Sequence, residues 1–110
     1  ERILKLIFET KPKLAVILSG DRHLGELSRL NDLALPYALY DVTSSGLTHH
    51  VDFFYRLRSF FSPEQNRYRV GKLFYHKNFG VIDIDLSGRT PAISLQLRGQ
   101  ENRIQRQANY

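Results

Sequence analysis

The stretch Leu14-Ala15-Val16-Ile17-Leu18-Ser19-Gly20-Asp21-Arg22-His23 decides the fold that we expect for this chain. Its first five residues are all apolar, and an apolar run without alternation is typical of a strand buried on both faces of a helix-covered parallel sheet. Gly20 then lets the chain bend sharply, because it has no Cβ. Ligands of such sheets bind beyond the carboxyl ends of the strands, so the turn that follows the run is a candidate site.

Asp21 and His23 are the candidate metal ligands of this turn. They place a carboxylate and an imidazole two residues apart, and mixed oxygen and nitrogen coordination suits a transition metal. An isolated Asp-x-His turn is more often structural, so the spacing alone leaves both interpretations open. Arg22 lies between the two ligands and would bind a phosphate if it pointed into the site, or would pair with a neighbouring carboxylate.

The length of the chain limits it to one small domain, and its positive charge favours anionic partners. The 110 residues include 16 Lys and Arg against 11 Asp and Glu, a net charge of +5, which favours phosphate esters, nucleic acid or acidic surfaces without choosing among them. The absence of Cys excludes disulfides and thiolate metal sites within this chain. No apolar run reaches the roughly 18 residues of a transmembrane segment. Because the chain opens at Glu1 without Met, we expect a piece of a longer protein.

A helix is predicted over residues 1–11, where an apolar stripe recurs at helical spacing and Pro12 ends the pattern. The helix leads directly into the strand at 14–18. Such a helix is half of a βαβ unit, so we expect the first strand of that unit, and with it the amino-terminal part of the domain, to lie outside the chain.

Alternating apolar residues predict the other strands. Residues 78–86 and 92–98 would form a β-hairpin, with these side chains facing the core: Ile82, Ile84, Leu86, Ile93, Leu95 and Leu97. We expect one mixed sheet from strands near 14–18, 37–43, 78–86 and 92–98, with apolar edges exposed where strands are missing.

The remaining segments carry weaker patterns. Residues 24–30 are expected to be extended, 51–61 to form an amphipathic helix, and 62–76 to be irregular and basic. Residues 99–110 are polar and are expected to form a frayed tail.

Three blocks of the sequence resemble the carboxyl-terminal part of the PhoD-like alkaline phosphatases, within the calcineurin-like metallophosphoesterase superfamily. They are Leu18–His23 together with Glu26–Leu30, then Leu39–Thr48, and then Asn78–Asp85. The resemblance implies an α/β fold, namely the carboxyl-terminal part of a four-layer α/β/β/α sandwich. Residues 1–98 would belong to this metallophosphatase domain and 99–110 to its tail.

The resemblance also implies a metal-dependent phosphoesterase that hydrolyses phosphomonoesters or phosphodiesters with a metal-activated water. Asp21 and His23 would be metal ligands, with Asp in place of the first His of the superfamily's Gly-His-x-His motif. Iron and calcium are the family's metals, and manganese and zinc occur in the wider superfamily. The remaining ligands would lie upstream of Glu1. Relatives of this family are often exported, which hints at an extracytoplasmic location.

Five further residues are candidates for supporting roles around the ligands. Arg22, Ser45 and His49 could contact substrate, although Ser45 also suits a turn and His49 a loop. A metal-bound histidine donates a hydrogen bond from its second ring nitrogen, and the carboxylate of Glu26 or Asp41 could accept it from His23.

Two other functions remain open on the residues alone. Basic and aromatic residues interleave between 53 and 75, as in a groove that stacks nucleic-acid bases; the basic ones are Arg56, Arg58, Arg67, Arg69 and Lys72. A charged loop over buried aromatics gives the same pattern. The chain could also be an inactive fragment or an interaction domain, because it holds a minority of the expected ligands.

Overall fold

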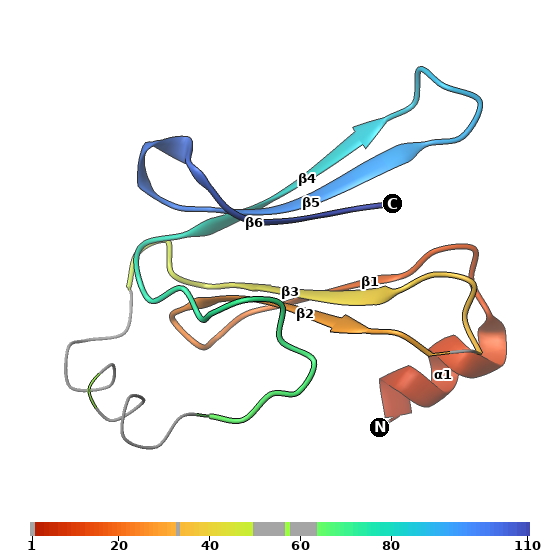
Figure 1. The fold of residues 1–110 in the computed structure, drawn as a ribbon, viewed down its shortest axis with the longest axis horizontal. Helices are drawn as coiled ribbons and strands as arrows, with labels where there is room; N and C mark the ends of the chain where they lie inside the picture. The colour runs from red at the N-terminus through yellow and green to blue at the C-terminus, as the bar shows by residue number, and fades with distance from the viewer. Residues whose placement is uncertain (1, 33, 50–56, 58–63) are drawn as a thin grey trace.

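The fold is given by a computed structural model, which describes residues 2–32, 34–49, 57 and 64–110. One helix and two three-stranded sheets make up the described chain (Figure 1). The elements in order are α1 (Arg2–Thr10), β1 (Val16–Ser19), β2 (Gly25–Leu30), β3 (Leu39–Ser44), β4 (Phe79–Asp85), β5 (Ala92–Arg98), the 3-10 turn η1 (Gln100–Asn102) and β6 (Ile104–Asn109). No helix in these described ranges is long and apolar enough to cross a membrane.

The strands expected in one mixed sheet are divided between two. The first sheet has the order β1-β3-β2, with β1 parallel and β2 antiparallel to β3. The second has the order β4-β5-β6 and is antiparallel throughout. The α/β class and the β4–β5 hairpin are therefore confirmed, whereas the single mixed sheet is wrong.

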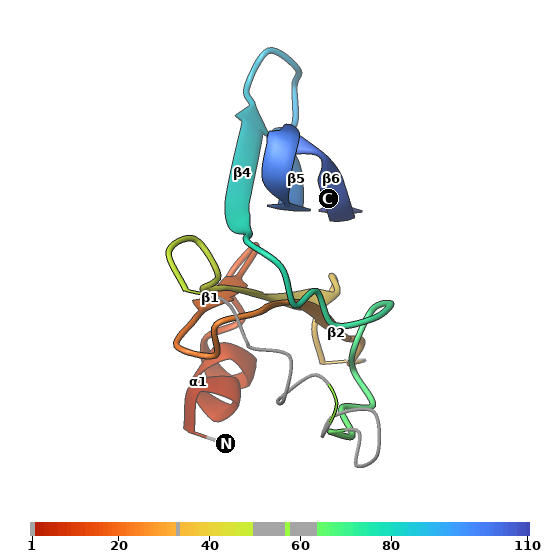
Figure 2. The same ribbon diagram turned by 90° about the vertical axis from the view of Figure 1, so that its left-hand side faces the viewer.

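The two sheets lie against each other, and α1 lies on the face of the first sheet that is turned away from the second (Figures 1 and 2). The core between the sheets contains Leu27, Val42, Leu95 and Ala108. Gly25 permits the close approach, because a Cβ at this position would lie 2.6 Å from Cδ2 of Leu97. The chain thus forms helix, sheet and sheet in three successive layers.

β1 is an edge strand in the described chain, and the expectation that it is buried on both faces is wrong. Leu18 is 62% exposed, because β1 pairs only with β3 among the described residues. β4 also lies at an edge, so Ile82, Ile84 and Leu86 are exposed where a core position was expected. In the central strand β5, by contrast, Leu95 and Leu97 are buried as predicted.

The carboxyl-terminal segment is ordered structure and not a frayed tail. β6 pairs with β5 from Asn109 opposite Ser94 to Ile104 opposite Arg98. Only Ala108 of this strand is buried, which explains why the sequence carries no apolar alternation there. The helices and strands expected over 1–11, 24–30 and 37–43 are found with small shifts of their ends, and the helix expected over 51–61 lies outside the described residues apart from Leu57.

Candidate functional site

The candidate site lies where the two parallel strands of the first sheet end. The turn with Asp21 and His23 follows β1, and Ser45 follows β3. Because β1 and β3 are parallel neighbours, their carboxyl ends meet at one end of the sheet. The backbone N–H of Arg22 donates to Oγ of Ser45 over 3.0 Å, and the Ser45 hydroxyl in turn donates to the carbonyl of Leu24 over 3.4 Å. Ser45 therefore joins the two turns.

Asp21 and His23 themselves make the sharp bend that was expected of Gly20. Their φ angles are +65° and +54°, whereas Gly20 has no positive φ. Asp and His are among the few residues with side chains that enter this left-handed region at modest cost. Both residues are exposed, and Arg22 between them is half-buried. The backbone thus presents the two candidate ligands to solvent and turns the intervening arginine toward the protein.

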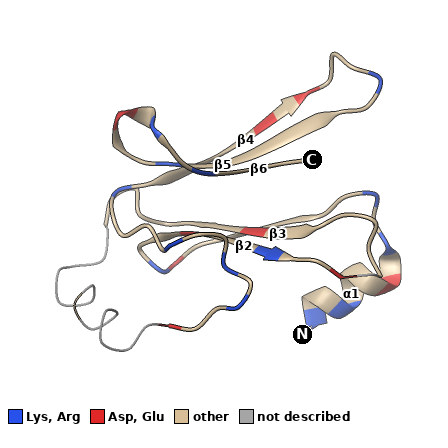
Figure 3. Cartoon of the chain, in the orientation of Figure 1, with Lys and Arg blue, Asp and Glu red and all other residues tan. Residues whose placement is uncertain are grey.

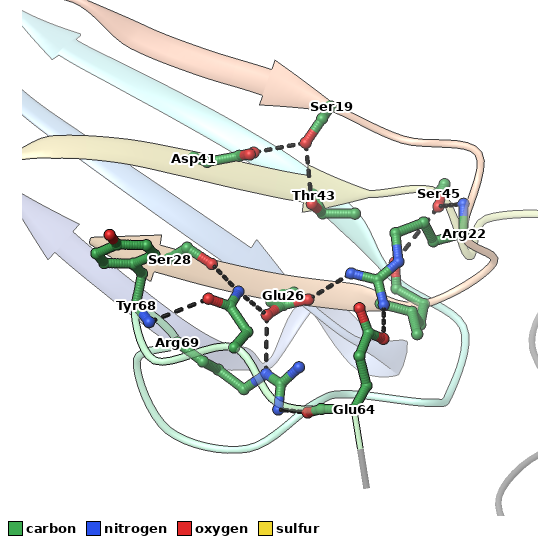
Figure 4. Close-up of polar contacts among 12 residues, drawn as sticks. Ser19, Arg22, Glu26, Ser28, Asp41, Thr43, Ser45, Glu64, Tyr68 and Arg69 are labelled. Atoms are coloured by element: carbon green, nitrogen blue, oxygen red, sulfur yellow. Dashed lines mark hydrogen bonds and ion pairs between the residues drawn. The ribbon is translucent and has the colours of Figure 1, made fainter. Parts of the chain in front are cut away.

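Arg22 pairs with carboxylates, which is the alternative that the sequence left open. Its Nη1 donates to Oε2 of Glu26 over 2.6 Å, and its Nη2 donates to Glu64 (Figure 4). Glu26 is 2% exposed and also accepts from Nε of Arg69 over 2.8 Å and from Nδ2 of Asn66 over 2.6 Å. We call Arg22, Glu26, Asn66 and Arg69 the Glu26 cluster.

The Glu26 cluster keeps its buried carboxylate ionised. Burial by itself would raise the pKa of the Glu26 carboxyl, but the hydrogen bonds from Arg69 and Asn66 and the charges of Arg69 and Arg22 outweigh it and lower the pKa below the ordinary value. A buried carboxylate with two cationic partners is a structural anchor. It fixes the 64–69 segment and the Arg22 side chain to β2.

The two residues expected to accept a hydrogen bond from His23 are engaged elsewhere in the described structure. Glu26 belongs to its own cluster, and Asp41 accepts from the hydroxyl of Ser19, which also contacts Oγ1 of Thr43 at 2.9 Å. His49 does approach His23, with 6.0 Å between the ring centroids. The Nδ1 atom of His49 lies 3.1 Å from the Thr48 hydroxyl. His23 and His49 are therefore the candidate-site residues that the structure brings side by side.

Asn78, the first residue of the third block of the resemblance, is hydrogen-bonded to the end of β3 and to the segment that follows it. It is 1% exposed and lies just before β4. Its Oδ1 accepts from the Ser44 hydroxyl over 3.2 Å and from the N–H of Gly46 over 3.4 Å, and its Nδ2 donates to the carbonyl of His76 over 2.8 Å. A Cβ on Gly46 would lie 2.1 Å from Nδ2 of Asn78, so glycine is required there. Asn78 thereby connects the second and third blocks of the resemblance.

The donor set fits a metal only in part. Among the residues that the structure describes, no three His, Cys, Asp or Glu side chains converge as a metal-binding group. Asp21 offers oxygen, and His23 and His49 offer imidazole nitrogen, which is the chemistry of a transition-metal site with mixed ligands. The described residues can therefore supply some ligands of such a site, but not a complete set.

The basic segment gives little support to a base-stacking groove. Arg69 is held by Glu26, and Arg67 lies over the ring of its neighbour Tyr68 at 4.7 Å. Arg56 and Arg58 lie outside the described residues. Figure 3 shows Lys and Arg spread over several elements, with Asp and Glu among them.

Comparison of the chain with protein-family models, with curated proteins and with solved structures found no match.

Proposed function

We propose that this chain is part of a metal-dependent phosphoesterase of the PhoD-like type and that it carries the last metal-ligand motif. The observation that supports the proposal is the pair of exposed side chains, Asp21 and His23, on one strained turn at the carboxyl end of a parallel strand. The α/β/β order of layers is compatible with three layers of a four-layer α/β/β/α sandwich.

In the proposed site Asp21 and His23 hold metal, and the remaining ligands come from polypeptide outside this chain. A metal held there would be iron or calcium by resemblance, with manganese or zinc as the alternatives, and would supply an activated water and positive charge to the phosphate ester. His49 lies beside His23 and in this proposal would contact the phosphate ester. Arg22 contributes indirectly, because its pairs with Glu26 and Glu64 fix the turn between the two ligands.

The test is hydrolysis of p-nitrophenyl phosphate and bis-p-nitrophenyl phosphate by the full-length protein, with bound metal measured by mass spectrometry. We expect His23→Ala and Asp21→Asn to lose metal and turnover together. His76→Ala is the matched control, because His76 is also exposed near this end of the sheets. Undiminished turnover in His23→Ala would refute the assignment.

The isolated 110-residue chain gives an independent check. If most ligands lie elsewhere, this chain alone should bind manganese or zinc weakly and hydrolyse neither ester. Stoichiometric, tightly held metal in the isolated chain would contradict the proposed division of ligands.

A further inference from the structure

His23 and its two neighbours in the chain differ in how firmly the structure holds them. His23 is exposed and has a φ of +54°, a left-handed conformation that a residue with a side chain keeps only where its surroundings impose it. Leu24 is 0% exposed, and the half-buried Arg22 side chain pairs with Glu26. The contacts that fix residues 22 and 24 therefore decide how the imidazole of His23 is presented.

Ser45 binds the residues on both sides of His23. Its Oγ accepts a hydrogen bond from the N–H of Arg22 over 3.0 Å and donates one to the carbonyl of Leu24 over 3.4 Å. The backbone N–H of Ser45 donates to the same carbonyl over 3.3 Å. A hydroxyl can donate and accept at once, so this one side chain restrains the turn before and after His23. Figure 4 shows Ser45 beside the backbone of Arg22.

Asn78 in turn binds the residues on both sides of Ser45. Its Oδ1 accepts from the Ser44 hydroxyl over 3.2 Å and from the N–H of Gly46 over 3.4 Å, and its own N–H donates to the carbonyl of Gly46 over 3.1 Å. Asn78 is 1% exposed, and its Nδ2 donates to the carbonyl of His76. A buried amide with partners on both its oxygen and its nitrogen is costly to displace. Asn78 therefore anchors the segment that carries Ser45.

We propose that Ser45 and Asn78 are positioning residues, which hold His23 in the conformation that binds metal. This inference rests on the proposed function, in which His23 is a metal ligand. Asn78 fixes the neighbours of Ser45, and Ser45 fixes the neighbours of His23. Both residues act through the backbone, and they order the ligand before metal arrives. Ordering in advance reduces the conformational entropy that binding must otherwise remove.

This arrangement gives the second sheet a part in the site. Asn78 directly precedes β4, whereas His23 follows β1 of the first sheet. A Cβ on Gly80 would lie 3.4 Å from the Cβ of Ser44, so the start of β4 packs closely on the end of β3. Changes at the start of β4 should therefore reach His23 through Asn78 and Ser45.

The test uses the full-length protein stripped of metal, with Mn²⁺ as the probe and Ser45→Ala as the variant. Without the hydroxyl, the Arg22 amide of the metal-free protein should exchange hydrogen at least about 10-fold faster. Mn²⁺ binding, measured by electron paramagnetic resonance, should weaken by about 10–100-fold. The melting temperature should fall by no more than about 4 °C, because one hydroxyl is lost. Ser45→Thr, which retains a hydroxyl, should restore both the slow exchange and the affinity.

Ser87→Ala is the matched control, since Ser87 is exposed in the β4–β5 turn at the opposite end of the sheets (Figure 1). It should change neither exchange at Arg22 nor Mn²⁺ binding. Unchanged exchange of the Arg22 amide in Ser45→Ala would overturn the positioning role, and so would unchanged affinity in a protein that binds Mn²⁺. If the natural protein binds no Mn²⁺, the proposed function fails, and the Arg22 amide alone decides whether Ser45 holds the turn.

A second variant tests the contribution of Asn78. Asn78→Ser shortens the side chain, so that Ser44 and Gly46 lose its oxygen, and exchange at Arg22 should again become faster. The double variant should bind Mn²⁺ little more weakly than Ser45→Ala alone, because both substitutions break one chain of contacts. Ser44→Ala, which removes only the hydroxyl donated to Asn78, gives the same comparison if Asn78→Ser does not fold. Additive losses of affinity would contradict the role of Asn78.

Discussion

The β2/β6 side of the sandwich and the β1/β4 side are built differently. At the first, the 64–78 segment covers β2, with Gly25 and Phe74 exchanging two backbone hydrogen bonds of 2.8 Å. The Tyr110 hydroxyl donates to the carbonyl of Ala38 over 2.6 Å and joins the two sheets. At the second side, Leu18 and Ile82 stay exposed. Among the residues that the structure describes, the β2/β6 side is therefore covered and the β1/β4 side is open.

This difference predicts that a leucine-to-alanine substitution will lower the unfolding free energy more in the core between the sheets than at the β1/β4 side. Leu95→Ala should cost about 2–5 kcal/mol of unfolding free energy, because this side chain is 1% exposed in the core. Leu18→Ala should cost less than about 1 kcal/mol in the 110-residue chain, because Leu18 is mostly in solvent. Urea denaturation measures both, and equal losses would show that the open side is already covered.

The Glu26 cluster stabilises the β2/β6 side, because Glu26 lies on β2. Glu26→Gln should cost about 2–3 kcal/mol, because Arg22 and Arg69 lose a shared charged acceptor. Glu9→Gln is the matched control, since Glu9 is exposed and lies 3.7 Å from Lys5 within α1; its cost should be less than about 0.5 kcal/mol. A similar small loss for both variants would argue against Glu26 as an anchor.

The Glu26 carboxylate should also make the stability of the β2/β6 side depend on pH in the acid range. Folding lowers the pKa of Glu26 from an ordinary value of 4.5. The associated stability is therefore fully present above about pH 4.5 and is lost as the pH falls through the lowered pKa. Chemical denaturation at a series of pH values should show a steeper loss below pH 4.5 in the natural chain than in Glu26→Gln. Parallel curves would contradict this source of acid sensitivity.

Tyr110→Phe should have a smaller effect than Leu95→Ala or Glu26→Gln. Burial raises its pKa to about 12, so its contribution is present below the ordinary value of 10.0 and is lost as the pH rises toward 12. Tyr110→Phe should cost about 1 kcal/mol at neutral pH by removing the hydrogen bond to Ala38. Absorbance of the phenolate in the natural chain and in the variant checks the titration. A tyrosine signal near pH 10 that Tyr110→Phe removes would contradict the buried position.

Sequence patterns predicted the elements better than their assembly. Helical spacing located α1, and alternation located β5 and its buried leucines. Alternation identifies a strand's faces but not its neighbours, so the division into two sheets could not be predicted. The apolar alternation also could not indicate that Ile82 and Ile84 lie on an edge strand of the second sheet. β6 was missed because an edge strand with a single buried residue, Ala108, has no apolar pattern.

The candidate site was predictable in position but not in its pairings. The apolar run before Gly20 placed the turn at a strand end, which the structure shows. Tertiary structure brings Arg69 to Glu26, which also binds Arg22. Glu26 and Arg69 are 43 residues apart in the sequence. No local spacing encodes such a contact, and the role in metal binding stays a prediction.

The left-handed backbone at Asp21 and His23 makes it possible to test the conformation of the turn separately from its candidate ligand atoms. Glycine enters this region without a steric cost, so replacing either residue with glycine would relax the main chain while deleting a donor atom. If the variant folded with higher stability but had no affinity for cations, the Asp21 and His23 side chains would be shown to bind metal at the cost of backbone strain.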